Sequence, residues 1–164
     1  LRGNVDTRLR KLAAGDLDGI VLAAAGLNRL GIKHDGAVAL DTDEFLPAIG
    51  QGALAIETRN DEAAALFSDY NDPATAAAVH AERAFLQRVG GSCRTPLAAH
   101  ATLRDAQIDL RALIAAVDGS EVIRGKCAGS STQATQLGIS LADELLLRGG
   151  RAILAALAES ADGG

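Results

Sequence analysis

Cys93 carries a thiol in a setting that could support covalent chemistry. It follows a helix-forming run that ends at two glycines and precedes Pro96, so a short loop should carry the thiol. The thiol could be a covalent attachment point, or it could pack in the core, since free cysteine is among the most buried residue types. The dipole of the preceding helix disfavours a thiolate, whereas Arg88 and Arg94 favour one. A cysteine that is alkylated once needs no permanently activated thiolate, so both interpretations stay open.

Three arginines near the start of the chain could bind an anionic ligand. Arg2 and Arg8 flank a predicted loop-to-helix junction, and Arg29 follows a predicted buried strand. In α/β sheets, ligands bind beyond the carboxyl ends of strands, where helix N-termini also favour anions. Guanidinium groups bind carboxylates through two hydrogen bonds, so converging arginines would suit a ligand with several carboxylates. The spacing alone favours the alternative, that these are ordinary solvated surface arginines.

Gln51 lies between Gly50 and Gly52, in an extended stretch that also contains Pro47. The amide could hydrogen-bond a ligand from a hinge, or the glycines could simply permit a tight crossover of the chain. Cys127 falls at the end of a predicted strand, where we expect it only to pack. The sequence predicts no metal site, because neither cysteine joins a cluster with metal-ligand spacing and the three histidines are scattered: His34, His80 and His100.

Composition narrows the class of protein. The formal net charge of -5 argues against a nucleic-acid partner, which would require a basic face. Two cysteines do not make a disulfide framework, so we expect a reducing cytoplasm. No apolar stretch reaches membrane-spanning length, so no membrane partner is expected. The chain also begins abruptly at Leu1, and we expect a longer parent protein.

The first part of the chain has the pattern of an incomplete α/β domain. Helices are predicted for Thr7–Ala14 and Gly26–Gly31, on either side of a continuous apolar run, Asp18–Ala24. An apolar run of strand length without alternation is typical of a strand buried on both faces of a parallel sheet. A further strand is predicted for Ala53–Glu57. Helix, buried strand, helix makes about half of an α/β domain.

The remainder has the pattern of a self-contained α+β domain. After a short helix at Glu62–Phe67, Asp72 as N-cap and Pro73 at the first helical position predict a helix to about Val89. Thr132 is expected to cap a later helix that runs to about Leu147, and a final helix follows at residues 151–158. Alternating apolar residues and the hairpin dipeptide Asp118-Gly119 predict an antiparallel meander of three strands: Ala98–Leu103, Ile108–Val117 and Glu121–Cys127.

These motifs, in this order, resemble the porphobilinogen deaminase family, also called hydroxymethylbilane synthases. The matching stretches cover nearly the whole chain: Leu1-Arg2-Gly3-Asn4-Val5, Thr7-Arg8-Leu9, Asp18–Gly31, Leu46–Ala53, Ala81–Phe85, Gly91-Ser92-Cys93 with Pro96, Asp118-Gly119 and Gly138–Ala142. Each stretch is modest alone, and the ordered set is specific. One departure is Ser92, where many members have glycine.

The resemblance implies a division into three regions. Residues 1–46 would be the second half of the family's second domain, an α/β unit that resembles periplasmic binding proteins. Residues 47–72 would be the crossover that returns to domain one. Residues 73–164 would be the C-terminal α+β domain, with a three-stranded antiparallel sheet and the cofactor cysteine. The expected fold class is therefore α/β plus α+β, without most of domain one and the first half of domain two.

The resemblance also implies an activity and a cofactor. Family members are transferases that join four porphobilinogen units into hydroxymethylbilane, with release of ammonia, in tetrapyrrole biosynthesis (heme and chlorophyll). A dipyrromethane cofactor is held by a thioether, and Cys93 matches the attachment position. Arg2, Arg8 and Arg29 match arginines that bind the acetate and propionate groups of the cofactor and of the growing polypyrrole chain. Asn4 and Gln51 match further polar ligands in the same site.

The resemblance places the family's catalytic aspartate in domain one, so no catalytic residue is expected in this chain. The aspartates that are present lie in other motifs: Asp16, Asp18, Asp41 and Asp43. The fragment alone is therefore expected to be inactive and to need the missing N-terminal part of the same protein as a partner. Two alternatives from other classes stay open, namely a non-catalytic α+β interaction module and a carboxylate-ligand-binding fragment.

Overall fold

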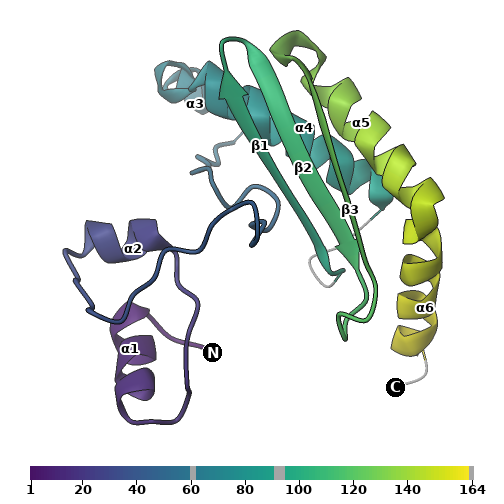
Figure 1. Cartoon of the computed structure of the whole chain (residues 1–164). Coiled ribbons are helices and arrows are strands. Elements are labelled where there is room, and N and C mark those ends of the chain that lie inside the picture. Colours follow the sequence, from purple (N-terminus) through teal and green to yellow (C-terminus); the bar gives the residue numbers. More distant parts are fainter. Residues whose placement is uncertain (60–61, 91–94, 163–164) are drawn as a thin grey trace. The chain divides into compact units, whose positions relative to one another are not determined.

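The computed structural model describes residues 1–59, 62–90 and 95–162. The chain divides into two compact units, Leu1–Asp41 and Thr42–Gly164, each described here by itself. The larger unit contains the hydrophobic core and the β-sheet (Figure 1). The smaller unit is helical, with long irregular connections.

The smaller unit contains two short helices, α1 (Val5–Ala13) and α2 (Ala24–Arg29). The side chain of Asn4 accepts a hydrogen bond from the backbone N–H of Thr7 at 3.0 Å and so caps the start of α1. Both helices confirm the sequence-based prediction to within two residues at each end. No residue of α1 or α2 is fully buried, so these helices contribute little core of their own.

The predicted buried strand at Asp18–Ala24 is wrong. The backbone of this stretch forms no strand in the structure, and the Val21 side chain is 79% exposed. The predicted strand at Ala53–Glu57 is also absent, and the Leu54 side chain is 96% exposed. A strand is stable only when neighbouring strands satisfy its backbone groups, and the described residues offer none beside either segment. The expected parallel α/β sheet is therefore not formed by the described part of this chain.

The larger unit begins with the irregular segment that follows Asp41, continues through α3 (Glu62–Ala65) and a 3₁₀ turn (Ser68–Tyr70), and then enters the long helix α4 (Pro73–Val89). The Asp72 side chain accepts a hydrogen bond from the backbone N–H of Thr75 at 2.7 Å. Gly90 ends the helix in the left-handed region, with φ 74°. Both predicted ends of α4 are confirmed.

The contribution of the Asp72 cap to the free energy of unfolding should depend on pH. The Thr75 backbone N–H lowers the pKa of the Asp72 carboxyl below its ordinary value of 3.8. Because the pKa is depressed in the folded state, the stabilisation is present above pH 3.8 and is lost as the pH falls through the lower folded-state pKa. We expect Asp72→Asn, which keeps a cap acceptor but does not titrate, to be less stable than the parent at pH 6 and equally stable at the acid end. Denaturant unfolding across this range measures the difference, and a gap that persists in acid would contradict the prediction.

The sheet is an antiparallel meander in the order β1 (Leu97–Arg104), β2 (Gln107–Ala115) and β3 (Val122–Ser130). The predicted strands and their order are confirmed. The first hairpin turns through Asp105 and Ala106, both with positive φ. The second turns at Gly119, where φ is 72°.

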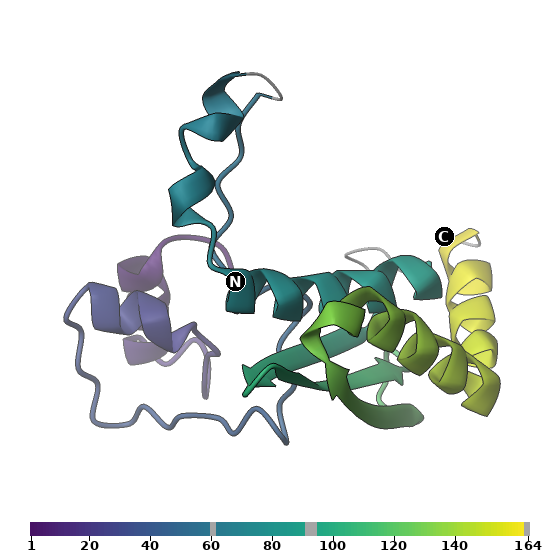
Figure 2. The same cartoon turned by 90° about the horizontal axis from the view of Figure 1, so that it is seen from above.

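One face of the sheet is covered by helices. Helix α4 packs against β1, α5 (Ala134–Leu145) packs against β3, and the two helices lie side by side (Figure 2). A kinked segment (Leu146–Gly150), in which Gly149 adopts a non-helical φ of 120°, then leads into α6 (Arg151–Asp162). The largest fully buried side chains come from α4, the central strand β2 and α5: Phe85, Ile108, Leu110, Ile114, Leu141 and Leu145. The architecture is thus mixed, with helices on one face of a three-stranded antiparallel sheet.

The N-terminal cap of α5 differs from the prediction. A 3₁₀ turn (Ser131–Gln133) precedes the helix, and the Ser130 side chain accepts from the backbone N–H of Thr132 at 3.3 Å. Ser130 therefore caps this turn, and α5 itself follows Gln133 without a side-chain cap, so the predicted cap at Thr132 is wrong.

Candidate functional site

Cys93 lies in residues 91–94, outside the described residues. Its two flanking elements are well defined, because α4 ends at Gly90 and β1 begins at Leu97. These elements pack against each other in the core of the larger unit. The ends of the cysteine-bearing segment are therefore anchored to one rigid framework.

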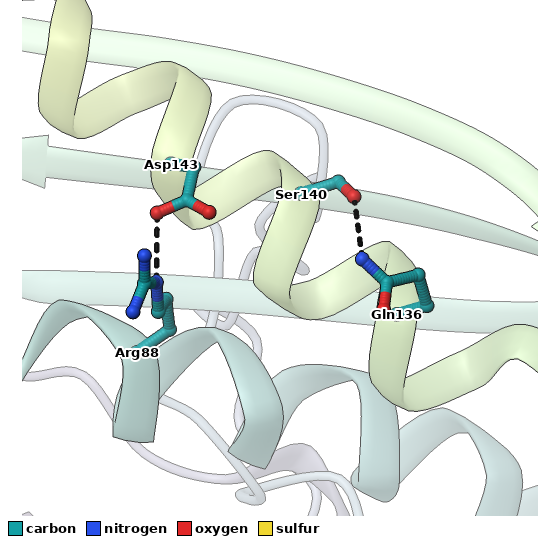
Figure 3. Close-up of polar contacts among 4 residues, drawn as sticks. All are labelled: Arg88, Gln136, Ser140 and Asp143. Atoms are coloured by element: carbon teal, nitrogen blue, oxygen red, sulfur yellow. Dashed lines mark hydrogen bonds and ion pairs between the residues drawn. The ribbon is translucent and has the colours of Figure 1, made fainter.

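Arg88, in the last turn of α4, was expected to favour a thiolate at Cys93. In the structure its Nε donates to Oδ1 of Asp143 on α5 at 2.7 Å (Figure 3). Both side chains are substantially exposed, so this ion pair is screened by solvent and adds little stability. Arg88 shares its charge with a carboxylate, and the contact joins the last turn of α4 to α5.

Glu82 is a buried carboxylate that the sequence-based reasoning did not select. It lies on the inner face of α4 with only 5% of its surface exposed. Its Oε1 accepts from the backbone N–H of Ala101 on β1 at 2.8 Å, and its Oε2 accepts from the backbone N–H of Gly50 at 2.7 Å. The Nδ1 of His100 lies 3.8 Å from Oε1. The available signal was a single acidic residue inside the apolar stripe of a helix, where charge is rarely tolerated without partners.

Gln51 lies in a tight turn that is held against the larger unit. Its backbone N–H donates to the carbonyl of Ala48 at 3.1 Å, and Gly50 adopts φ 75°, a conformation that suits glycine. Ile49 packs against the hydrophobic core, whereas the Gln51 side chain is exposed. The chain therefore makes the tight turn that the glycines would permit. The same turn leaves the side-chain amide of Gln51 exposed and available to a ligand.

A pocket of about 310 Å³ borders this turn. It is lined by residues of the turn, of α4 and of β1, and the polar side chains among them are Thr75, Glu82, His100 and Thr102. The other lining residues are small or apolar, so the pocket has few groups that could orient a ligand.

The remaining predicted ligands lie in the smaller unit. Asn4 uses its side-chain oxygen to cap α1, and Arg8 donates from Nε to the carbonyl of Gly3 at 2.8 Å. These two residues and Arg2 thus lie together at the start of α1. Arg29 is the last residue of α2, where the helix dipole stabilises a positive charge. Its side chain is exposed. The predicted cofactor ligands are divided between the two units.

Cys127 packs in the larger unit, as the sequence predicted. Burial, with a smaller effect of Glu144 and Asp109, raises the pKa of the Cys127 thiol above its ordinary value of 9.0. The Cys127 side chain packs against the core and its Sγ lies 3.7 Å from the carbonyl oxygen of Leu137, which confirms the packing prediction. Across residues 1–59, 62–90 and 95–162, no group of three potential ligands could hold a metal ion. No helix in that part of the chain has the length and apolarity to cross a membrane.

Two sequence profiles of one protein family match the chain in order. The profile described as "Porphobilinogen deaminase, dipyromethane cofactor binding domain" matches residues 1–66, and "Porphobilinogen deaminase, C-terminal domain" matches residues 76–147. Curated proteins named porphobilinogen deaminase are similar along most of the chain. The relative from Pelobacter propionicus is 52% identical over 159 residues, which cover 94% of this chain and 50% of the relative.

Two further relatives give the same result. The protein from Trichlorobacter lovleyi is 50% identical over 156 residues, or 94% of this chain and 50% of the relative. The protein from Roseiflexus castenholzii is 50% identical over 157 residues, or 94% of this chain and 52% of the relative. The chain belongs to the porphobilinogen deaminase family, and it spans about half the length of the curated relatives it matches.

Proposed function

We propose that this chain is the C-terminal portion of a transferase that joins four porphobilinogen units into hydroxymethylbilane and releases ammonia, a step of tetrapyrrole biosynthesis. The observation that carries the proposal is the ordered match of both family profiles, together with about 50% identity to the deaminases over 94% of the chain. The match to the C-terminal-domain profile at residues 76–147 supports the C-terminal position.

The proposed cofactor is a dipyrromethane attached through a thioether to Cys93. The predicted ligands of its carboxylates all fall within the match to the cofactor-binding-domain profile: Arg2, Asn4, Arg8, Arg29 and Gln51. Cys93 itself falls within the match to the C-terminal domain. The side chains of Arg2, Arg29 and Gln51 are exposed, so their donors are accessible to a ligand. These residues therefore fit a group that carries several carboxylates.

The charge of the proposed polypyrrole explains why arginine side chains suit its binding site. Each pyrrole unit carries two carboxylates, so a growing chain accumulates negative charge that fixed guanidinium groups offset. When bound, the dipyrromethane supplies the primer for chain extension. The residues of this chain then bind and orient carboxylates, while the proton-handling aspartate belongs to the part of the relatives that this chain does not match. On this proposal the chain alone is inactive.

The domain assignment is part of the same proposal. Residues 1–46 would complete an α/β domain resembling periplasmic binding proteins, residues 47–72 would return to domain one, and residues 73–164 would form domain three. Exposed apolar side chains on the crossover support a missing packing partner: Leu54, Ile56 and Leu66. That partner would be the N-terminal part of the same protein, with porphobilinogen and the growing polypyrrole as ligands in the cytoplasm.

A split-protein experiment tests the proposal. The chain would be mixed with the half of the Pelobacter propionicus deaminase that it does not match, and conversion of porphobilinogen would be followed as product absorbance. We expect product only when both halves are present, and none from either half alone. Two halves that fold by circular dichroism and make no product would overturn the proposal.

The same preparation distinguishes the alternatives. Association of the two halves without product would favour a non-catalytic interaction module, whose folded part is the larger unit with its continuous core. Binding of small di-acids without covalent modification would favour a carboxylate-binding fragment. In that case charge reversal at Arg2 or Arg8 should abolish di-acid binding.

A further inference from the structure

Glu82 joins three segments that are distant in the sequence. It projects from α4, accepts a hydrogen bond from Ala101 on β1, and accepts another from Gly50 in the turn before Gln51. Both carboxylate oxygens are therefore used, at 2.8 Å and 2.7 Å. We call this set of contacts among Glu82, Ala101 and Gly50 the Glu82 bridge.

The bridge satisfies one backbone N–H on a sheet edge that, within the described part of the chain, has no strand beside it. β1 lies at one edge of the sheet, and β2 pairs with its other side. Along an antiparallel strand, the backbone groups of successive residues point alternately toward and away from the partner strand. The Ala115 N–H donates to the Pro96 carbonyl, so Pro96 faces β2 and every second residue after it does the same. The N–H of Ala101 therefore points away from β2. Such a buried donor is costly if it is left without an acceptor. Glu82 supplies that acceptor and uses its second oxygen for the turn.

A second contact lies further upstream, in the stretch of chain that leads to this turn. Asp43 forms an ion pair with Arg111 on β2, and Arg111 lies opposite His100 on β1. Ile49 packs on the core between these two attachment points. The segment from Asp43 to Gly50 thus contacts β2 through an exposed, solvent-screened ion pair at one end and contacts the buried Glu82 carboxylate at the other. Only the Gly50 end lies beside a predicted cofactor ligand.

We propose that Glu82 is a positioning residue, which holds the turn carrying Gln51 in a fixed place relative to α4 and β1, the elements that flank Cys93. This inference rests on the proposed function, because it gives Gln51 the task of binding a carboxylate or pyrrole of the proposed cofactor. A carboxylate is suited to this position since it offers two acceptors and no donor. A glutamine would direct its NH₂ group toward one of two N–H donors and break that contact.

Amide hydrogen exchange on the chain tests the bridge directly. In Glu82→Gln, we expect the Gly50 or the Ala101 amide to exchange at least about tenfold faster, because a hydrogen bond to a charged acceptor is lost. The Gly119 amide, which donates to the Ala116 carbonyl at 3.0 Å in a remote hairpin, serves as an internal control. The control variant is Glu144→Gln, which removes an exposed carboxylate paired with Arg148. Unchanged exchange at both Gly50 and Ala101 would overturn the bridge.

Kinetics of the assembly with the N-terminal half test the positioning role. We expect Glu82→Gln and Gln51→Ala each to raise the KM for porphobilinogen by about fivefold or more while the mass of the Cys93 adduct is retained. The double variant should be no worse than the more affected single variant, since both remove the same contact. A double variant whose KM rises by the product of the two single increases would overturn the positioning role. If the unmodified assembly makes no product, the proposed function fails, and the exchange rates still decide whether Glu82 holds the turn.

Discussion

Cys93→Ser should abolish covalent cofactor loading and, with it, tetrapyrrole synthesis by the assembled protein. A serine hydroxyl is a much weaker nucleophile than a thiol at neutral pH, so it does not form the stable link that a thioether provides. Intact-mass measurement on protein from a heme-synthesising host should show an adduct on the parent and none on Cys93→Ser. An aldehyde stain for pyrroles should lose its colour in the same variant.

Cys127→Ser is the matched control for that experiment. Cys127 packs against the core, and burial raises the pKa of its thiol, so it is a poor nucleophile. We expect Cys127→Ser to keep both the adduct and the activity. An adduct that persists in Cys93→Ser, or that disappears only in Cys127→Ser, would contradict the assignment of Cys93.

Gly138→Ala should destabilise the larger unit by about 3 kcal/mol or prevent it from folding, because it overpacks the contact between α4 and α5. A Cβ at Gly138 would lie 2.2 Å from the carbonyl oxygen of Ala81 and 2.8 Å from the backbone nitrogen of Phe85. These are backbone atoms, so the helices must separate to make room. Denaturant unfolding followed by circular dichroism measures the loss of stability.

Gly52→Ala is a matched control in the same unit. A Cβ at Gly52 would meet no atom within 4 Å, so we expect a change of less than about 1 kcal/mol. Equal stabilities of Gly138→Ala and the parent would show that α4 and α5 are not packed as closely in solution as the structure describes.

Local signals in the sequence determined most of the larger unit. Asp72 and Pro73 specify the start of α4 because a side-chain acceptor and a preset φ both favour a first helical turn. Asp118 and Gly119 specify a hairpin, since glycine accepts the positive φ that the turn needs. Alternating apolar residues then assign one face of the central strand β2 to the core. All of these effects act within a few residues.

The two predicted strands of the first 60 residues failed for a non-local reason. The apolar runs at Asp18–Ala24 and Ala53–Glu57 have the composition of buried strands, but composition does not supply neighbours. A strand in the interior of a sheet is stable only when neighbouring strands on both sides form hydrogen bonds with its backbone. The chain spans about half the length of its relatives, and the described residues provide no such neighbours for these runs.

The sequence by itself determined the family and which residue types can bind a carboxylate-rich cofactor, because motifs and their order are properties of the chain alone. Only the tertiary structure revealed how some of these residues are engaged. Arg88 is paired with Asp143, and Glu82 joins Gly50 to β1. These contacts depend on segments up to 55 residues apart, and neither spacing nor periodicity encodes which buried carboxylate meets which backbone N–H. For Cys93, the sequence supplies the thiol and the fold supplies the two anchored elements beside it.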